Sequence, residues 1–170
     1  FLDYQVHELD EFNPNGTGRS FFGDKMELTS TKNFNFSFPN VITTKTCWVK
    51  TAMAGRNFSP ANFEVSIDHV KKATYSIQTT AGTTQDPYAN EVGGWVNANP
   101  TGETVCITLK HDALGYSTTS EGYVDYILVN AWRNLKMAGG QMPFRNPEAL
   151  INNKVYEYKL TNASQQLQVW

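Results

Sequence analysis

Cysteine and histidine side chains are the first to consider for chemistry, because a thiolate next to an imidazole base is a nucleophile. The chain has two cysteines, Cys47 and Cys106, and the histidines that could serve them are His69 and His111. Both cysteines lie in stretches that read as strands, where a thiol lacks the exposed, electropositive setting of a reactive group. We therefore expect small side chains that fill sheet positions, and no catalytic residue in this chain.

The same two cysteines could instead form a disulfide bond. They lack the CxxC spacing of zinc and redox motifs. Cys106 alternates with Val105 and Ile107, which predicts that these apolar neighbours face the core while the thiol faces outward. A bridge would form if Cys47 and Cys106 occupy neighbouring strands, and two unpaired thiols fit the sequence equally well.

Metal ligands have one candidate location, a loop near the start of the chain. The histidines His7, His69 and His111 lack the spacing of a zinc site. Calcium suits the loop better, because acidic and amide side chains crowd around its glycines and calcium prefers oxygen ligands. Turn chemistry explains the same residues, so we expect no cofactor and keep calcium as the alternative. The loop candidates are Asp10, Glu11, Asn13 and Asn15.

Residues 13–18 of this loop also superficially resemble a phosphate-binding loop. The GxG is followed by Arg19 and Ser20, without a third glycine or a Gly-Lys-Ser/Thr. A tight turn is therefore the better interpretation, and nucleotide binding is not expected.

Carboxylates could form the acid–base pair of a glycosidase, but nothing in the spacing selects a pair. Asp125 is unusual because it falls inside an apolar stretch, on the side of Tyr123 and Ile127, where a charge is costly unless paired. Arg133 is on the same side but about 13 Å away at strand rise. We expect another partner, either in a salt bridge or in a functional site; the options are Arg19, Arg145, backbone amides or an ion. The other available carboxylates are Glu64, Asp68 and Glu157.

Tryptophan side chains could bind a ligand by stacking. Trp48 and Trp95 are candidates for an exposed platform that packs against sugar rings, whereas Trp132 is expected to fill the core.

The element that must position these residues is residues 123–135. Val, Ile and Tyr dominate it, and apolar residues fall on both alternating faces, which predicts a central strand covered on both sides. Gly139 and Gly140 end it. About ten short strands follow this kind of alternation, which predicts an all-β fold of two antiparallel sheets, a jelly-roll-like β-sandwich. Besides the central strand, the predicted strands are 1–9, 25–29, 33–38, 43–54, 61–69, 73–80, 92–98, 103–110, 154–160 and 167–170. One short helical turn is predicted at 146–152.

Composition bounds the class of protein. The length of 170 residues predicts a single β-sandwich domain over 1–170, with 1–12 either an edge strand or the tail of a preceding domain. Charged residues are 18% of the chain against a typical ~25%, and aromatic residues are 13%, a mixture typical of extracellular β-proteins. The net charge of −2 without a basic stripe argues against nucleic-acid binding, and no apolar run predicts a membrane span. The chain starts without Met or a leader pattern, so we expect a piece of a longer protein.

Two stretches resemble PorU-type proteins, the gingipain-related cysteine peptidases that act as the sortase of the type IX secretion system in Bacteroidetes. The first is NPNGTGRSFFG from Asn13 to Gly23, and the second is YVDYILVNAWRNLKMAGGQMPFRN from Tyr123 to Asn146. In the family both lie in the β-rich region before the peptidase domain, towards which a Val-Trp like Val169-Trp170 leads. The residues of the second stretch that match the family pattern are Asp125, Tyr126, Ile127, Val129, Asn130, Ala131, Arg133, Leu135, Gln141, Met142, Phe144 and Arg145.

The resemblance covers nearly the whole chain and implies a non-catalytic β-sandwich domain of a cell-surface cysteine peptidase. The family's catalytic His is followed by Gly, whereas the three histidines here precede Glu8, Val70 and Asp112, so no catalytic residue is carried over. Implied partners are the peptidase domain of the same chain and secreted substrate proteins or other secretion components. The implied location is beyond the inner membrane, at the outer-membrane surface or outside the cell. The alternatives are a carbohydrate-binding jelly-roll module and a self-sufficient hydrolase.

Overall fold

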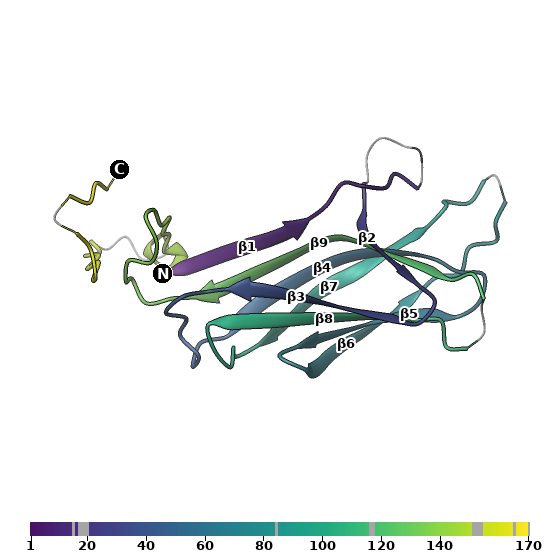
Figure 1. Cartoon of the computed structure of the whole chain (residues 1–170), viewed down its shortest axis with the longest axis horizontal. Coiled ribbons are helices and arrows are strands. Elements are labelled where there is room, and N and C mark those ends of the chain that lie inside the picture. The colour runs from purple at the N-terminus through teal and green to yellow at the C-terminus, as the bar shows by residue number, and fades with distance from the viewer. Residues whose placement is uncertain are drawn as a thin grey trace.

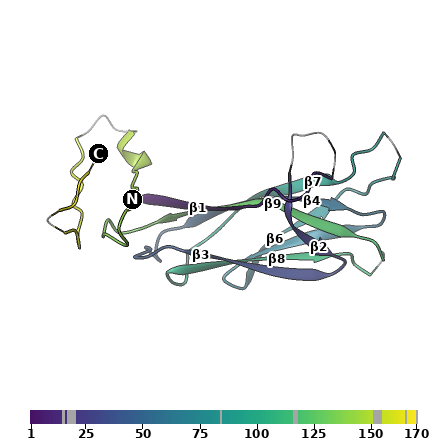
Figure 2. The ribbon, with the colours of Figure 1, turned by 45° about the horizontal axis from the view of Figure 1, so that its top comes forward.

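Two antiparallel sheets packed face to face make up the fold, a β-sandwich of the jelly-roll type that the sequence predicts. The computed structural model describes residues 1–14, 16, 21–83, 85–115, 118–150, 155–164 and 166–169. Figure 1 shows the strands running along the long axis, and Figure 2 shows the two layers from the side. No helical segment of the described residues is long and apolar enough to cross a membrane.

The first sheet is organised around β9 (Glu121–Trp132), which confirms that the predicted central strand lies in the middle of a sheet. One edge of β9 pairs with β4 (Cys47–Arg56), which in turn pairs with β7 (Asn90–Ala98). The other edge pairs with β1 (Leu2–Glu8) and, further along, with β2 (Gly23–Glu27). The N-terminal segment is therefore an edge strand of this sandwich.

The second sheet has the order β3-β8-β5-β6. Its strands are β3 (Ser30–Ser37), β8 (Thr104–Asp112), β5 (Ala61–Ile67) and β6 (Val70–Ile77). The hairpin between β5 and β6 turns at Asp68 and His69, which both have positive φ, as a two-residue type I′ turn requires.

Alternating apolar residues from both sheets meet in one core. Phe63 from β5, Leu109 from β8 and Val129 from β9 are each fully buried, while their chain neighbours face outward. Burial of each such side chain contributes about 1.5–3 kcal/mol. This is the strict alternation on which the strand predictions depended.

The prediction that β9 is covered on both faces is half right. Ile127, Val129 and Ala131 are buried in the core, but Tyr126, Leu128 and Trp132 on the opposite face are only half-buried. Trp132 is therefore not a core residue, and the strand ends at Trp132 instead of residue 135. At one end of this outer face Tyr123 and Ala54 are buried in a small second cluster with Phe22 and Ala89. Further along, the outer face stays half-exposed.

A β-bulge corrects the predicted orientation of Asp125. Ala52 of β4 pairs with Tyr126 and Met53 pairs with Val124, so Asp125 is the extra residue on β9. Val124 takes the core position, with 1% of its surface exposed. The carboxylate therefore does not lie in the core, and the cost of burying a charge there is avoided.

The segment after β9 does not contain the two strands predicted for it. Residues 155–160 and 167–169 form no strand, and Lys154 and Trp170 lie outside the described residues. The segment runs beyond the end of the sandwich near the N-terminus, and a short 3₁₀ turn, Pro147–Leu150, lies in it (Figure 1). Val155 and Val169 alternate like strand residues but are largely exposed, because no neighbouring strand offers a face to bury them.

Candidate functional site

The structure separates the cysteines from the histidines. Cys47 lies in β4 of the first sheet and Cys106 in β8 of the second, and both are free thiols. Cys47 is fully buried, and burial raises the pKa of its thiol, which opposes formation of a thiolate. Cys106 faces outward as predicted, with its sulfur 3.9 Å from Thr108 Oγ1. Among the described residues neither sulfur lies within hydrogen-bond distance of a histidine ring.

The three histidines have separate structural roles. His7 Nε2 lies 2.5 Å from Asp24 Oδ2, His69 is exposed in the β5–β6 turn, and His111 is fully buried. No three His, Cys, Asp or Glu side chains of the described residues are grouped as metal ligands would be. Of the calcium candidates, Asp10 and Asn13 are described and Asn15 lies outside the described residues, so a calcium site there stays a prediction.

His111 gives a measurable pH dependence. It packs against the ring of Phe63, with ring centroids 5.1 Å apart, and its Nε2 lies 3.3 Å from Ser120 Oγ. Burial lowers the pKa of the imidazole, so the unfolded chain takes up the proton more readily than the folded chain. This contribution to stability is complete above the unfolded pKa of about 6.5 and is lost as the pH falls towards the folded pKa.

We therefore expect His111 to lower the free energy of unfolding as the pH falls from about 6.5 to its folded pKa. The expected slope is up to about 1.4 kcal/mol for each pH unit. Urea denaturation from pH 7.5 to pH 5 measures the effect. His111→Leu should flatten the slope, whereas His69→Asn in the exposed turn should leave it unchanged. Parallel pH profiles for wild type and His111→Leu would contradict the assignment.

Most of the predicted carboxylates are structural or exposed. Asp68 accepts hydrogen bonds from the amide and hydroxyl of Thr101 and from the amide of Cys106, and so holds the β5–β6 turn against β8. Glu64 pairs with Lys71 at 2.7 Å, and Glu157 is exposed after the sandwich. No pair of these carboxylates faces a common cleft.

The two platform candidates lie on one face, the outer face of the first sheet. β4 pairs Trp48 with Asn97 and Lys50 with Trp95, so the two tryptophans are diagonal neighbours on adjacent strands. Trp48 is 40% exposed and Trp95 is 56% exposed. The platform itself stays a prediction, but both side chains have the exposure that it needs.

The pairing of β1, β9, β4 and β7 arranges the outward-facing side chains of this face in three rows that run across the strands. One row contains Trp48 and another contains Trp95, while the third has small side chains at its centre. The rows are Tyr4, Asn130, Trp48 and Asn97; Val6, Leu128, Lys50 and Trp95; and Glu8, Tyr126, Ala52 and Gly93. An aromatic face of this kind on the outside of a sandwich is typical of a binding surface.

Cations lie over several of these rings. Lys50 Nζ is 5.9 Å from the centroid of the Trp95 ring and 5.5 Å from that of Tyr126. At the other end, Lys45 Nζ is 4.1 Å from the Trp132 ring. These contacts hold the side chains in place and put donors beside the rings.

Asp125 lies at a small hollow of this face, about 320 Å³ in volume, whose lining includes Lys50, Glu91, Gly93 and Gly94. Of the two arginines proposed as its partner, Arg145 donates to Asn130 instead, and Arg19 lies outside the described residues. Burial raises the pKa of the Asp125 carboxyl above its ordinary value, and nearby negative charges raise it further. Those charges belong to Glu8, Glu91 and Asp10.

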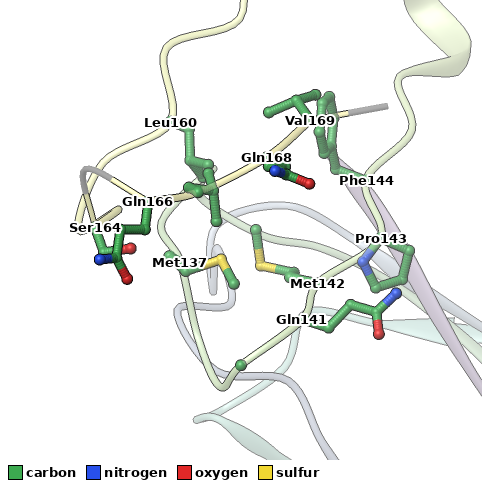
Figure 3. A pocket seen from close by; sticks show the side chains of 12 residues that line it. Met137, Gln141, Met142, Pro143, Phe144, Leu160, Ser164, Gln166, Gln168 and Val169 are labelled. Atoms are coloured by element: carbon green, nitrogen blue, oxygen red, sulfur yellow. The ribbon is translucent and has the colours of Figure 1, made fainter.

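A larger cavity, of about 730 Å³, lies after the sandwich rather than on it (Figure 3). Its lining includes Met137 and Met142 from the stretch after β9, Leu160 from further along the chain, and the glutamines Gln141, Gln166 and Gln168. Its described lining contains no cysteine, histidine, carboxylate or basic side chain. It therefore lacks the groups for acid–base or thiol chemistry.

Sequence reasoning missed Lys50, which lies between the rings of Trp95 and Tyr126, and Glu91, which lines the hollow together with Asp125. The pair Gly93-Gly94 beside Trp95 was a signal, since glycine in a strand marks a bulge or a close approach. The register that brings Gly93, Ala52 and Tyr126 side by side depends on three strands distant in sequence.

Comparison with known proteins finds likeness at the level of structure. No protein-family model matches the chain, and no curated protein sequence matches it. Dimeric latent PorU from Porphyromonas gingivalis superposes with a TM-score of 0.66 at 14% identity, over 82% of this chain and 13% of that one. The chain thus spans only a small part of the PorU chain. At that identity the likeness shows a shared fold.

Carbohydrate-binding modules are also similar, at lower scores. The CBM36-1 domain of a multidomain xylanase from the hindgut metagenome of Trinervitermes trinervoides gives a TM-score of 0.45 at 13% identity, over 75% of this chain and 96% of that one. A family 35 module from Clostridium thermocellum gives 0.44 at 16% identity, over 75% and 91%.

Proposed function

We propose that this chain is a non-catalytic β-sandwich domain of a gingipain-like cell-surface cysteine peptidase of the PorU type. It supports the peptidase domain or docks secreted substrate proteins. The observation that carries the proposal is the superposition on part of PorU, which extends over 82% of this chain. The separation of both thiols from every described histidine supports a role without catalysis.

The stretch that resembles the PorU type has a structural role consistent with this proposal. Its two halves contact each other after the chain leaves β9: Arg133 Nη2 lies 3.7 Å from Met142 Sδ, and Arg145 Nη2 donates to Asn130 Oδ1 at 3.0 Å. The motif therefore fixes the direction in which the chain leaves the sandwich. A fixed exit would position a following domain against this one.

An open sheet edge is available for docking. β1 is an edge strand, and among the pairings of the described residues only Leu2 is bridged on the free side, to Arg145. Tyr4 and Val6 further along are about half exposed, at 50% and 47%. An extended segment of a partner could add to this edge by main-chain hydrogen bonds.

The test has a genetic and a biochemical part. The coding sequence after Trp170 should encode a caspase-like domain with a His-Gly and a catalytic cysteine. The chain alone should give no turnover of peptidase substrates, and its Cys47→Ser and Cys106→Ser variants should not differ from it. A longer protein that includes the following domain should turn over these substrates. Activity of the isolated chain that disappears in Cys106→Ser would overturn the proposal, as would an unrelated downstream sequence.

The alternative function, a carbohydrate-binding module, is favoured by one observation. Trp48 and Trp95 are exposed on adjacent strands of the same face, as a sugar-stacking surface requires. The two functions are compatible, because docking at β1 would use main-chain groups at the edge of the sheet, whereas glycan binding would use side chains of β4 and β7.

A further inference from the structure

The hollow on the outer face of the first sheet results from the register of three strands. Ala52 of β4 lies between Gly93 of β7 and Tyr126 of β9 in one row. Two of these three side chains are the smallest available, so the sheet surface is low there, while Trp95 and Tyr126 stand beside it. The bulge adds Asp125 to the lining from the β9 side.

The floor of the hollow is fixed by the backbone. Gly93 has φ of 152°, and a Cβ atom there would lie 2.1 Å from the carbonyl oxygen of Thr51. No other residue fits this position without moving β4 or β7. The low surface is therefore built into the strand pairing and does not depend on the rotamer of a side chain.

The polar groups in the lining supply both donors and acceptors. Asp125 and Glu91 contribute carboxylate oxygens, and no hydrogen bond or ion pair joins the Asp125 carboxylate to another described residue. Lys50 contributes an ammonium group held between two aromatic rings. A half-buried carboxylate that pairs with no described cation is stabilised by hydrogen-bond donors from a ligand.

The ligand class follows from these groups. A cationic ligand is disfavoured, because the Lys50 ammonium already lies between the Trp95 and Tyr126 rings. Its positive charge would repel a second cation there. A sugar satisfies all the groups: its hydroxyls donate to carboxylates and accept from lysine, while its apolar C–H face packs against an exposed indole. The volume of about 320 Å³ is at the small end for ligand pockets and suits one ring.

We propose that this hollow binds one sugar ring of a glycan chain. Trp95 is the stacking surface, and Asp125 with Lys50 holds the hydroxyls. Trp48, diagonal to Trp95 in the next row, stacks on an adjoining ring of the same chain. This proposal assigns residues to the carbohydrate-binding alternative. It does not depend on whether the parent protein is a peptidase.

The test uses the full chain with a panel of hexasaccharides: cellohexaose, xylohexaose, mannohexaose, laminarihexaose and chitohexaose. Isothermal titration calorimetry and tryptophan fluorescence are expected to detect binding of at least one of them. Trp95→Ala should weaken that binding at least tenfold, Asp125→Asn should weaken it severalfold, and Trp48→Ala should lower affinity for hexasaccharide more than for disaccharide. Val70→Ala, exposed at the start of the edge strand β6 in the second sheet, is the matched control and should change nothing.

Three outcomes would overturn the site. The first is that no member of the panel binds to a chain whose circular dichroism and thermal unfolding show that it is folded. The second is that Trp95→Ala binds as well as wild type, and the third is that a lysine-rich peptide competes with the sugars and binds more tightly. Trp95 is 56% exposed, so its truncation leaves the core intact. Absence of sugar binding would leave the test of the peptidase parent unaffected.

Discussion

Replacing Arg133 with alanine is expected to lower the free energy of unfolding by about 3–5 kcal/mol, because it leaves a buried carboxylate without its partner. Arg133 Nη1 lies 2.6 Å from Asp3 Oδ2, with both side chains almost fully buried. Its Nε also donates to the carbonyl oxygen of Pro39 at 2.6 Å, and its guanidinium covers the ring of Phe1. One side chain thus joins β1, the end of β9 and the loop after β3.

Urea denaturation followed by tryptophan fluorescence measures this loss, and Arg145→Ala is the matched control. Arg145 also lies over an aromatic ring, that of Tyr4 at 4.5 Å, but it is exposed. Its removal should cost no more than about 1 kcal/mol. A double variant, Asp3→Leu with Arg133→Met, should recover much of the stability, since an apolar pair can replace a buried ion pair. Equal losses in Arg133→Ala and Arg145→Ala would contradict this account.

Alternation along the chain was enough to predict the fold class. Phe63, Val65 and Ile67 alternate with polar residues in one stretch, and such a strand can bury only one face. Repetition of the pattern at short intervals, without a convincing helix, indicates two sheets. The central strand was predictable for the same reason, since its apolar content exceeds that of its neighbours.

Two features of the fold depended on contacts that local patterns do not contain. Asp125 obeys the alternation of β9 in sequence, and only the pairing of Ala52 with Tyr126 shows the extra residue that turns it away. Residues 155–160 alternate as a strand would, but alternation does not supply a partner strand. Alternation within one segment therefore predicts more strands near the end of the chain than the described part of the structure contains.

The candidate site was predictable in part. Residue type alone made Trp48 and Trp95 candidates for a platform, and the register places both on the outer face of the first sheet. Lys50 and Tyr126 could not be added from the sequence, because their contact depends on how β4 lies between β7 and β9. Among the partners expected for Asp125, Arg145 donates to Asn130 instead, Arg19 lies outside the described residues, and the carboxylate lines a hollow.

Gly93→Ala is expected to lower the free energy of unfolding by about 2–6 kcal/mol. A residue with a side chain at φ of 152° costs about 1–3 kcal/mol, and forcing an atom into a packed site costs about 1–3 kcal/mol more. The added Cβ would meet the Thr51 carbonyl oxygen at 2.1 Å, which belongs to the backbone of β4 and cannot rotate away. The strain is therefore relieved only by separating two paired strands.

A graded series of glycines tests this explanation by urea denaturation. Gly94→Ala should cost less than Gly93→Ala, because its Cβ would meet the hydroxyl end of the Tyr75 side chain, which can move. Gly102→Ala should change stability by no more than about 0.5 kcal/mol, since nothing lies within 4 Å of its added Cβ. If Gly93→Ala were as stable as Gly102→Ala, the pairing of Gly93 with Ala52 would be wrong. The floor of the proposed sugar site would then be lost with it, because that pairing is what keeps the surface low beside Trp95.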